Sequence, residues 1–373
     1  MFDSVSNLYI VFGASFAVSV CLCIATTRFY SVFGRDGDVG ADQAAHSKPT
    51  LRLGGFALIA GLLVGFIKEP LATNVVGWII LCALPLIFVG ICEDLGVHVS
   101  PKNRLISIAV SVLAAMAAFG ITVDRIGLPG FDLLLTFAPF AILFTLFGAT
   151  GVLNAFNLID GLNGLASFTG ASTALILGYI SLSYGHMDLA VLSGIIFSAT
   201  LGFFVVNYPT RRLFLGDAGA YFLGFSLICT ALTLFSREPG ISAFAVVLIF
   251  FWPIADTVLA MWRRGRASAR HDQPDRLHYH QLVMRFLEIR WFGRGVRHVS
   301  NPLATIILIP MIVAPQCAAI YVINENTKAM AIVALFSVCF FGSYVFCMNL
   351  AKISRLVHRR KTQKTIPDQI AAE

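Results

Sequence analysis

The chain has 373 residues, of which 57% are hydrophobic and only 13% charged, and its formal net charge is +7. Together with a mean hydropathy of +0.81, this composition excludes a water-soluble globular protein of ordinary make-up and predicts an integral membrane protein. The eight cysteines lie apart, mostly inside apolar runs, so they indicate neither a disulfide framework nor a zinc site.

Eleven apolar segments come close to the roughly 17–25 residues that a membrane-spanning helix needs. The first lacks the basic start and the small-residue cleavage pattern of a signal peptide, so we expect a retained helix, and the second is short for a span. The sequence therefore predicts an all-α, polytopic bundle of about eleven transmembrane helices. They are expected at 8–27, 53–67, 75–92, 105–123, 133–152, 165–183, 188–208, 219–235, 242–262, 303–323 and 329–350.

Lys and Arg residues are concentrated in alternate connections between these segments. The first, third, fifth, seventh and ninth connections, together with the C-terminal tail, hold 23 of the 27. Because positively charged connections tend to stay in the cytoplasm, this asymmetry predicts an N-terminus outside and an active site at the cytoplasmic face. We expect one transmembrane catalytic domain, 1–350, that includes the basic loop 263–302, and a basic cytoplasmic tail, 351–373.

Two polar segments precede the middle of the chain on the expected cytoplasmic side. The first, "HSKPTLRLGG", carries Lys48 and Arg52, which fit either an ordinary positive-inside signal or a phosphate site. The second, "GICEDLGVHVSPKNR", ends the third span with Glu93 and Asp94. Acidic groups at a helix C-terminus oppose the helix dipole, so a divalent cation or a general-base role explains them better than a solvated helix end.

The third polar segment, "NAFNLIDGLNGLA", spaces four polar side chains at three-residue intervals. Each such step turns an ideal helix by about 300°, so a continuous helix could not aim all four at one ligand. Gly161 and Gly164 instead predict a helix end that runs into a tight turn. The four side chains are Asn154, Asn157, Asp160 and Asn163.

The fourth and fifth polar segments are "RRLFLGDAGAYFLG" and "RHDQPDRLHYHQLVMR". Asp217 in the fourth could cap the next span, but the glycines on both sides would also let a ligand approach. In the fifth, His278 and His280 with Arg276 fit either contact with anionic lipid or a phosphate site. Four acids and these cations together predict Mg²⁺ or Mn²⁺ bridging a phosphate, and hence phosphoryl transfer. The "HQLVMRFLEIRWF" stretch is expected to form a helix on the membrane surface or on its own loop.

The segments "HSKPTLRLGG", "GICEDL", "NAFNLIDGLNGLA", "FLGDAG" and "RLHYHQL", in this order, resemble the polyprenyl-phosphate N-acetylhexosamine-1-phosphate transferases of glycosyltransferase family 4. The resemblance covers roughly residues 46 to 285. It implies Mg²⁺-dependent transfer of N-acetylhexosamine 1-phosphate from a UDP-N-acetylhexosamine to undecaprenyl phosphate, with release of UMP, to start a cell-envelope glycan such as O-antigen. It places the protein in the bilayer of a bacterial inner membrane, with no nucleic-acid partner, and leaves a homodimer open.

Carried over position by position, the resemblance also implies roles for the matched side chains. Asp217 would be a principal Mg²⁺ ligand, together with Asp94 and Asn157. Asp94 would also deprotonate or orient the lipid phosphate, and Phe214 would stack on the uracil. The other expected catalytic residues are Glu93, Asp160 and His278, and the other expected substrate-binding residues are Lys48, Asn154, Asn163, Arg276 and His280.

Two positions depart from the family pattern, and three alternatives stay open. Glu93 stands where the family has the first of two aspartates, and Asn163 stands where the family has the second Asp of "DGxDG". The peptidoglycan enzyme, phospho-N-acetylmuramoyl-pentapeptide transferase, typically has three consecutive histidines, which "LHYHQL" does not match. A lipid-linked sugar transporter would carry polar residues inside its spans, where Asp256 beside Pro253 is the one case here. The third alternative is a catalytically inactive relative.

Overall fold

The computed structural model describes residues 2–33, 50–210, 212–266, 278–292 and 296–370. Over these residues the chain is helical, and its one β-type contact is an isolated parallel bridge. The helices are α1 (Phe2–Phe33), α3 (Gly55–Lys68), α4 (Thr73–Asp94), α5 (Pro101–Phe119), α6 (Pro129–Leu135), α7 (Ala138–Ile159), α8 (Leu165–Ser183), α9 (Met187–Thr210), α10 (Gly216–Arg237), α11 (Ala243–Ile249), α12 (Phe251–Arg266), α13 (Tyr279–Leu287), α14 (Arg297–Tyr321) and α15 (Asn326–Ile370), and a π-helical turn, η1, covers Glu288–Phe292.

Every expected span overlaps at least one of these helices. Within the described residues nine helices are long and apolar enough to cross a membrane, and α11 with α12 makes a tenth if the bent pair counts as one span. The segment that was short for a span forms α3, which has only 14 residues. The fold is therefore that of a polytopic helical membrane protein, as the apolar pattern predicts.

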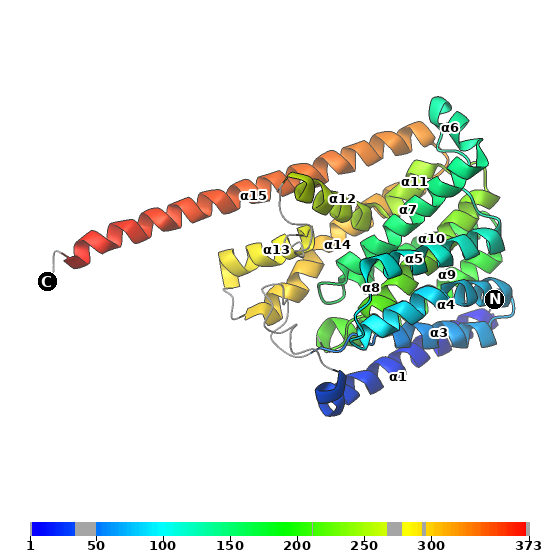
Figure 1. Cartoon of the computed structure of the whole chain (residues 1–373), viewed down its shortest axis with the longest axis horizontal. Coiled ribbons are helices and arrows are strands. Elements are labelled where there is room, and N and C mark those ends of the chain that lie inside the picture. Colours follow the sequence, from blue (N-terminus) through cyan, green and yellow to red (C-terminus); the bar gives the residue numbers. More distant parts are fainter. Residues whose placement is uncertain (1, 34–49, 211, 267–277, 293–295, 371–373) are drawn as a thin grey trace.

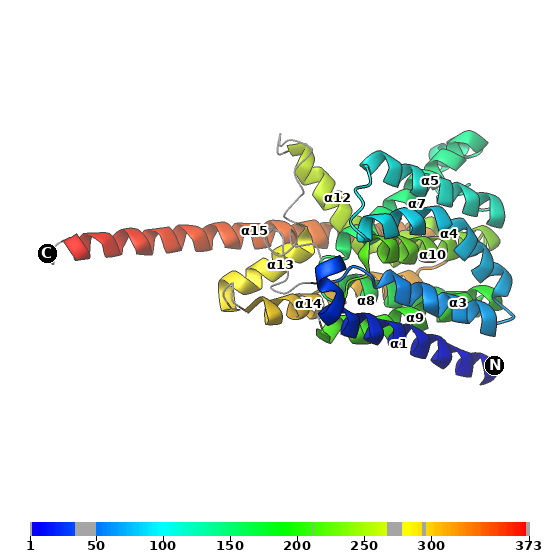
Figure 2. The ribbon, with the colours of Figure 1, turned by 60° about the horizontal axis from the view of Figure 1, so that its bottom comes forward.

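Helix α10 is the centre of the bundle, and nearly all of its residues are buried. It packs on α4 and α7 and also on α3, α8 and α9, while α1, α3 and α9 lie together at one side (Figure 2). Its first turn approaches its neighbours closely. A Cβ atom on Gly55 would lie 2.6 Å from the Gly219 nitrogen, and one on Gly90 would lie 2.4 Å from the Ala218 Cα. Glycine at these positions lets helix backbones meet, as is common in membrane bundles.

The span that the sequence placed at 242–262 is broken, with an 83° bend between α11 and α12. Pro253 has no N–H, so the carbonyl of Ile249 four residues earlier loses its helical donor. The Gln316 side chain of α14 reaches this carbonyl with its Nε2 atom at 3.4 Å. The bend directs α12 away from the line of α11 (Figure 1). Asp256 of α12 accepts a hydrogen bond from the N–H of Tyr279, the first residue of α13.

The segment before α3 and the segment before α10 lie side by side. Leu51 and Leu213 form the parallel bridge, in which the Leu51 N–H donates to Arg212 and the Phe214 N–H donates to Leu51. The N–H of Gly54 then donates to the Phe214 carbonyl. Two polar segments that are far apart in the sequence are thus joined at one end of the bundle.

The C-terminal helix α15 runs along the bundle and then extends well beyond it (Figure 1). It passes residue 350 without a break, and the division into a domain at 1–350 and a tail at 351–373 stays a prediction. The expected helix after His280 is formed by α13 and η1. Ile289 and Trp291 there are each 65% exposed, so this stretch presents an apolar edge, as a surface helix would.

Candidate active site

Two carboxylates from other helices bind the N-terminus of α10. Asp94, the last residue of α4, accepts hydrogen bonds from the N–H groups of Asp217 (2.8 Å) and Ala218 (3.0 Å). Asp160, just after α7, accepts one from the N–H of Gly216 (3.1 Å). The first N–H groups of a helix have no partner within the helix, and the partial positive charge there favours anions. The ends of α4 and α7 are therefore fixed to the start of α10.

Asp217 is in the first turn of α10, and its own side chain does not cap that helix. Its Oδ1 atom accepts a hydrogen bond of 2.9 Å from Nδ2 of Asn157 on α7. Three carboxylates, those of Asp94, Asp160 and Asp217, thus meet around one helix end. The helix end and turn expected at 154–166 are confirmed, since α7 ends at Ile159 and Gly164 has a φ of +75°.

The three carboxylates act on one another electrostatically. Burial raises the pKa of Asp160 well above its usual value, and the nearby charges of Asp94 and Asp217 raise it further. The Gly216 N–H and the positive charge of Arg52 act in the opposite direction. Clustered carboxylates that repel one another are a favourable place for a cation. The available donors are carboxylate and amide oxygens, which is the set that Mg²⁺ or Mn²⁺ prefers.

Glu93 is directed away from the three carboxylates and forms an ion pair with Arg104 of α5, with 2.7 Å between Oε1 and Nη2. Arg104 also lies close to Tyr221 and Asp217 of α10. Sequence reasoning missed Arg104 and Tyr221, although Arg104 lies only ten residues after Asp94. The longer side chain of Glu93 therefore connects α4 to α5 through the ion pair with Arg104.

Replacing Glu93 by Asp, the residue of the family pattern, is expected to leave transfer activity within about threefold of the original. Replacing it by Ala is expected to cost roughly 1 kcal/mol of stability, because the pair with Arg104 is only partly screened by solvent. Thermal unfolding and initial rates of the two variants check this. A hundredfold loss of rate in Glu93→Ala at unchanged stability would instead support the catalytic role expected from the sequence.

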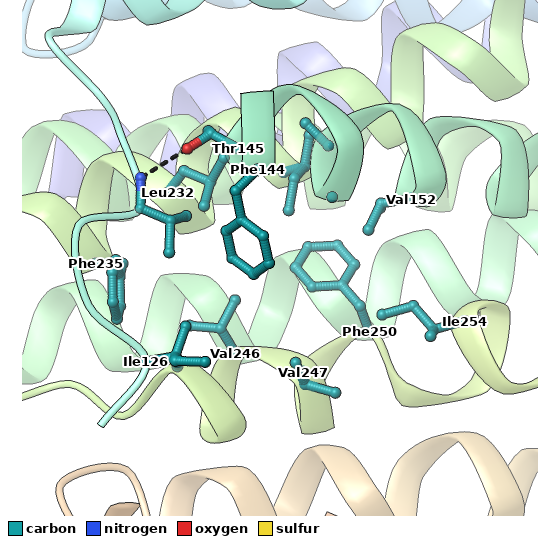
Figure 3. Close-up of a pocket in the computed structure, with 15 residues that line it drawn as sticks. Ile126, Phe144, Thr145, Val152, Leu232, Phe235, Val246, Val247, Phe250 and Ile254 are labelled. Carbon is teal, nitrogen blue, oxygen red and sulfur yellow. Dashed lines mark hydrogen bonds between the residues drawn. The ribbon is translucent and has the colours of Figure 1, made fainter. Parts of the chain in front are cut away.

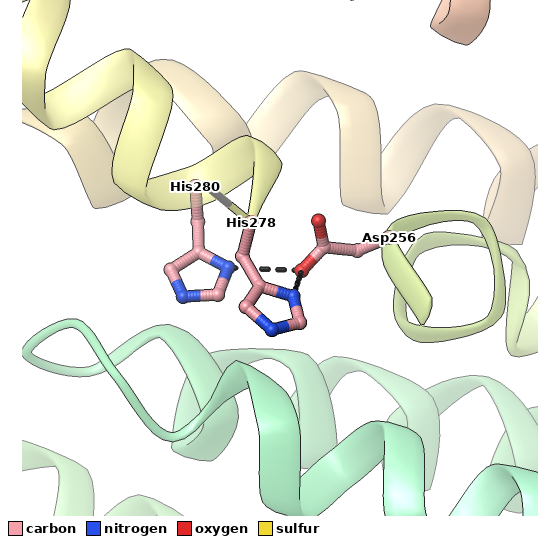
Figure 4. Close-up of side chains that lie close together, drawn as sticks. All are labelled: Asp256, His278 and His280. Carbon is pink, nitrogen blue, oxygen red and sulfur yellow. Dashed lines mark hydrogen bonds and ion pairs between the residues drawn. The ribbon is translucent and has the colours of Figure 1, made fainter. Parts of the chain in front are cut away.

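The two histidines form a second, buried cluster around Asp256 of α12. The Nδ1 atoms of His280 and His278 lie 2.9 Å and 3.3 Å from the same Asp256 oxygen, Oδ2. The other oxygen accepts the N–H of Tyr279 at 2.6 Å. Figure 4 shows both rings extending from the start of α13 towards this carboxylate. The one acid inside a span, which sequence reasoning considered only as a sign of a transporter, is thus bound to the predicted histidines.

The histidine cluster reaches the carboxylate cluster through the turn between α7 and α8. A Cβ atom on Gly161 would lie 3.0 Å from Nε2 of His280, and Gly161 is the residue after Asp160. Burial lowers the pKa of His280, whereas the Asp256 carboxylate opposes that change. The third, fourth and fifth polar segments of the sequence therefore meet at one end of the bundle.

The remaining predicted residues are placed less centrally. Asn154 donates to the Thr150 carbonyl of its own helix, and Phe214 is only 6% exposed. Asn163 is fully buried, and its backbone groups bind Asn301 and Thr305 of α14. Predicted roles of these side chains in substrate binding stay predictions. Lys48 and Arg276 lie outside the described residues.

An apolar cavity of about 180 Å³ lies between α7, α10, α11 and α12 (Figure 3). Phe144 and Val152 of α7, Leu232 of α10 and Phe250 at the bend between α11 and α12 line it. Thr145 is the polar side chain of the lining, and its hydroxyl accepts the Val123 N–H at 2.8 Å. No pattern in the sequence indicated this cavity, because it depends on the bend.

Comparison with known proteins agrees with this arrangement. The model of glycosyl transferase family 4 matches residues 76–235. The chain is 30% identical over 256 residues to the probable undecaprenyl-phosphate N-acetylglucosaminyl 1-phosphate transferase of Bacillus subtilis (strain 168), which covers 67% of this chain and 70% of that protein. It is 29% and 28% identical to the undecaprenyl-phosphate alpha-N-acetylglucosaminyl 1-phosphate transferases of Salmonella typhi and Escherichia coli (strain K12), over 83% of each chain. With three carboxylates, two histidines and this level of similarity, the chain belongs to glycosyl transferase family 4.

Proposed function

We propose that this protein transfers N-acetylglucosamine 1-phosphate from UDP-N-acetylglucosamine to undecaprenyl phosphate and releases UMP. The observation that carries the proposal is the meeting of Asp94, Asp160 and Asp217 at the start of α10. The names of the relatives support the sugar and the lipid. We further propose that the reaction starts a cell-envelope glycan at the cytoplasmic face of a bacterial inner membrane.

In the proposed reaction an oxygen of the lipid phosphate attacks the β-phosphorus of the UDP-sugar. The new P–O bond forms as the bond from that phosphorus to the oxygen bridging to the α-phosphate breaks, and UMP leaves with the electron pair. Such a transfer requires alignment and charge neutralisation more than covalent chemistry from the protein. A bound Mg²⁺ would supply positive charge to the diphosphate, with Asp217 as its main ligand.

The residues of the chain have separate proposed tasks. Asp94 and Asp160 hold the backbone on both sides of Asp217, and a role of Asp94 as the base stays part of the proposal. Asn157 orients the Asp217 carboxylate. Nε2 of His280 lies next to the turn after Asp160 and, in the doubly protonated ring, would donate to the diphosphate. The cavity beside Phe250 is suited to the apolar lipid chain, because its lining is almost wholly hydrocarbon.

Purified protein given undecaprenyl phosphate and labelled UDP-N-acetylglucosamine is expected to form a lipid product and UMP in equal amounts. EDTA should abolish the reaction, and added Mg²⁺ or Mn²⁺ should restore it, because carboxylate ligands bind these hard cations. A panel of other UDP-N-acetylhexosamines and of UDP-N-acetylmuramoyl-pentapeptide tests the donor. If no donor yields lipid product while the folded protein still binds the lipid, the transferase proposal fails.

A further inference from the structure

Asp256 is a fully buried carboxylate within α12, one of the two helices of the bent span. A charge in such a place is costly unless it is paired and hydrogen-bonded. Here the partners are Nδ1 of His280, Nδ1 of His278 and the N–H of Tyr279. Two hydrogen bonds and a second imidazole at 3.3 Å on one carboxylate are more than packing alone needs.

The geometry of these contacts determines which ring nitrogen of His280 binds Asp256 and which one is available to bind a substrate. Because Nδ1 of His280 hydrogen-bonds the Asp256 carboxylate, which can only accept, this nitrogen carries the proton and Nε2 of the ring is turned away. Nδ1 of His278 lies 3.3 Å from the same oxygen and makes no hydrogen bond within the described residues. The two rings are nearly parallel, with 21° between their planes and 5.4 Å between their centroids. Nε2 of His280 is buried and has no hydrogen-bond partner in the described part of the chain.

The surroundings hold Asp256 and its partners in place. Trp252 packs edge-on against Tyr279 with ring centroids 5.6 Å apart, and Phe340 packs against both rings. The Tyr279 hydroxyl hydrogen-bonds Ser343 of α15 at 2.8 Å. Water has little access, so the hydrogen bonds to Asp256 are stronger than they would be at a surface.

We propose that Asp256 is a positioning residue of the transferase. It holds the Nδ1–H of His280, keeps the His278 ring beside it, and aims Nε2 of His280 at the turn that carries Asp160, where the donor diphosphate would bind. Its negative charge also favours the doubly protonated His280 ring, whose Nε2–H can donate to that diphosphate. The inference rests on the proposed function, because its purpose is to orient a group for that reaction. A metal held by the same three side chains is the competing explanation, since their ligand atoms lie within 4.8 Å of one another.

The test compares Asp256→Asn, His280→Gln and the double variant in the full-length protein. Asn keeps the size of the side chain but has only one acceptor oxygen, so it cannot accept from both Tyr279 and His280. Loss of such an orienting partner typically costs about 10–100-fold. We expect that loss in kcat/KM for Asp256→Asn alone. In the His280→Gln background the same change should cost less than about threefold, since Asp256 acts through that ring. The matched control is Thr257→Val, one residue away, because the buried Thr257 hydroxyl has no hydrogen-bond partner among the described residues. This variant should leave the rate unchanged.

Gly161→Ala gives a second route if Asp256→Asn does not fold. Its new Cβ would press on Nε2 of His280 at 3.0 Å and leave the Asp256 contacts in place. It should lower kcat/KM about tenfold in the original protein and not at all in His280→Gln. Equal losses in both backgrounds, for either variant, would mean a merely structural role and overturn the inference.

Two further readouts separate this inference from the proposed function. Nitrogen NMR of labelled histidine should show a ring protonated at Nδ1 that is lost in Asp256→Asn. If the wild-type protein makes no lipid product, the proposed function fails, and these spectra still decide the pairing, because unchanged signals overturn it. One equivalent of tightly bound zinc that disappears in Asp256→Asn would also overturn it, in favour of a metal site.

Discussion

Replacing Asp217 by Asn is expected to lower lipid-product formation by about 10²–10³-fold, the usual cost of losing one preorganised electrostatic group. The substituted amide has the same shape, and its Oδ1 atom can still accept the hydrogen bond from Asn157. The start of α10 stays bound by Asp94 and Asp160, since both contacts are made to backbone N–H groups. The variant should therefore unfold at the same temperature as the original protein and lose only transfer activity.

The measurement is the initial rate as a function of Mg²⁺ concentration, because a weakened metal site should require more Mg²⁺ for half-maximal rate. Asp188→Asn is the matched control. Asp188 lies in the first turn of α9 and pairs with Arg237 at 2.7 Å, away from the three carboxylates. That variant should keep the original rate and Mg²⁺ dependence. A fully active Asp217→Asn would remove this carboxylate from the proposed metal site.

Sequence patterns predicted the helices well because the length of an apolar run is set by the membrane, whatever the run packs against. The bend between α11 and α12 was not predicted, although Pro253 was noted beside Asp256. Proline frees one carbonyl, but whether the helix bends depends on a neighbour such as Gln316 that can bind it. The apolar cavity is lined by residues on both sides of the same bend, so the sequence did not predict it either.

The sequence predicted which residues and which turn form the candidate site, but it did not predict which side chains contact one another. Spacing and glycines placed a turn after Asp160, and the structure confirms it. The direction of a side chain, however, depends on helices that are far apart in the sequence. Nothing local indicates that Glu93 faces Arg104 whereas its neighbour Asp94 faces α10. Likewise, Asp256 looked isolated because its partners start a helix more than twenty residues later.

Gly216→Ala is expected to damage the fold and the site together. Gly216 has a φ of +72°, which a residue with a Cβ adopts at a cost of about 1–3 kcal/mol. Its Cβ would also lie 2.1 Å from the Arg52 carbonyl oxygen and 2.7 Å from both oxygens of Asp94. Backbone atoms cannot move aside as a flexible side chain would. We expect a total loss of roughly 3 kcal/mol in stability and no detectable lipid product.

Thermal unfolding and initial rate are measured together for this variant, with Gly342→Ala of α15 as the control. A Cβ on Gly342 meets open space, so that change should keep the activity and slightly stabilise the helix. An active Gly216→Ala with normal stability would mean that Asp94 does not need its close contact with α10. Because Asp217→Asn should lose activity alone whereas Gly216→Ala should lose activity and stability together, the pair separates the charge of the site from the backbone that holds it.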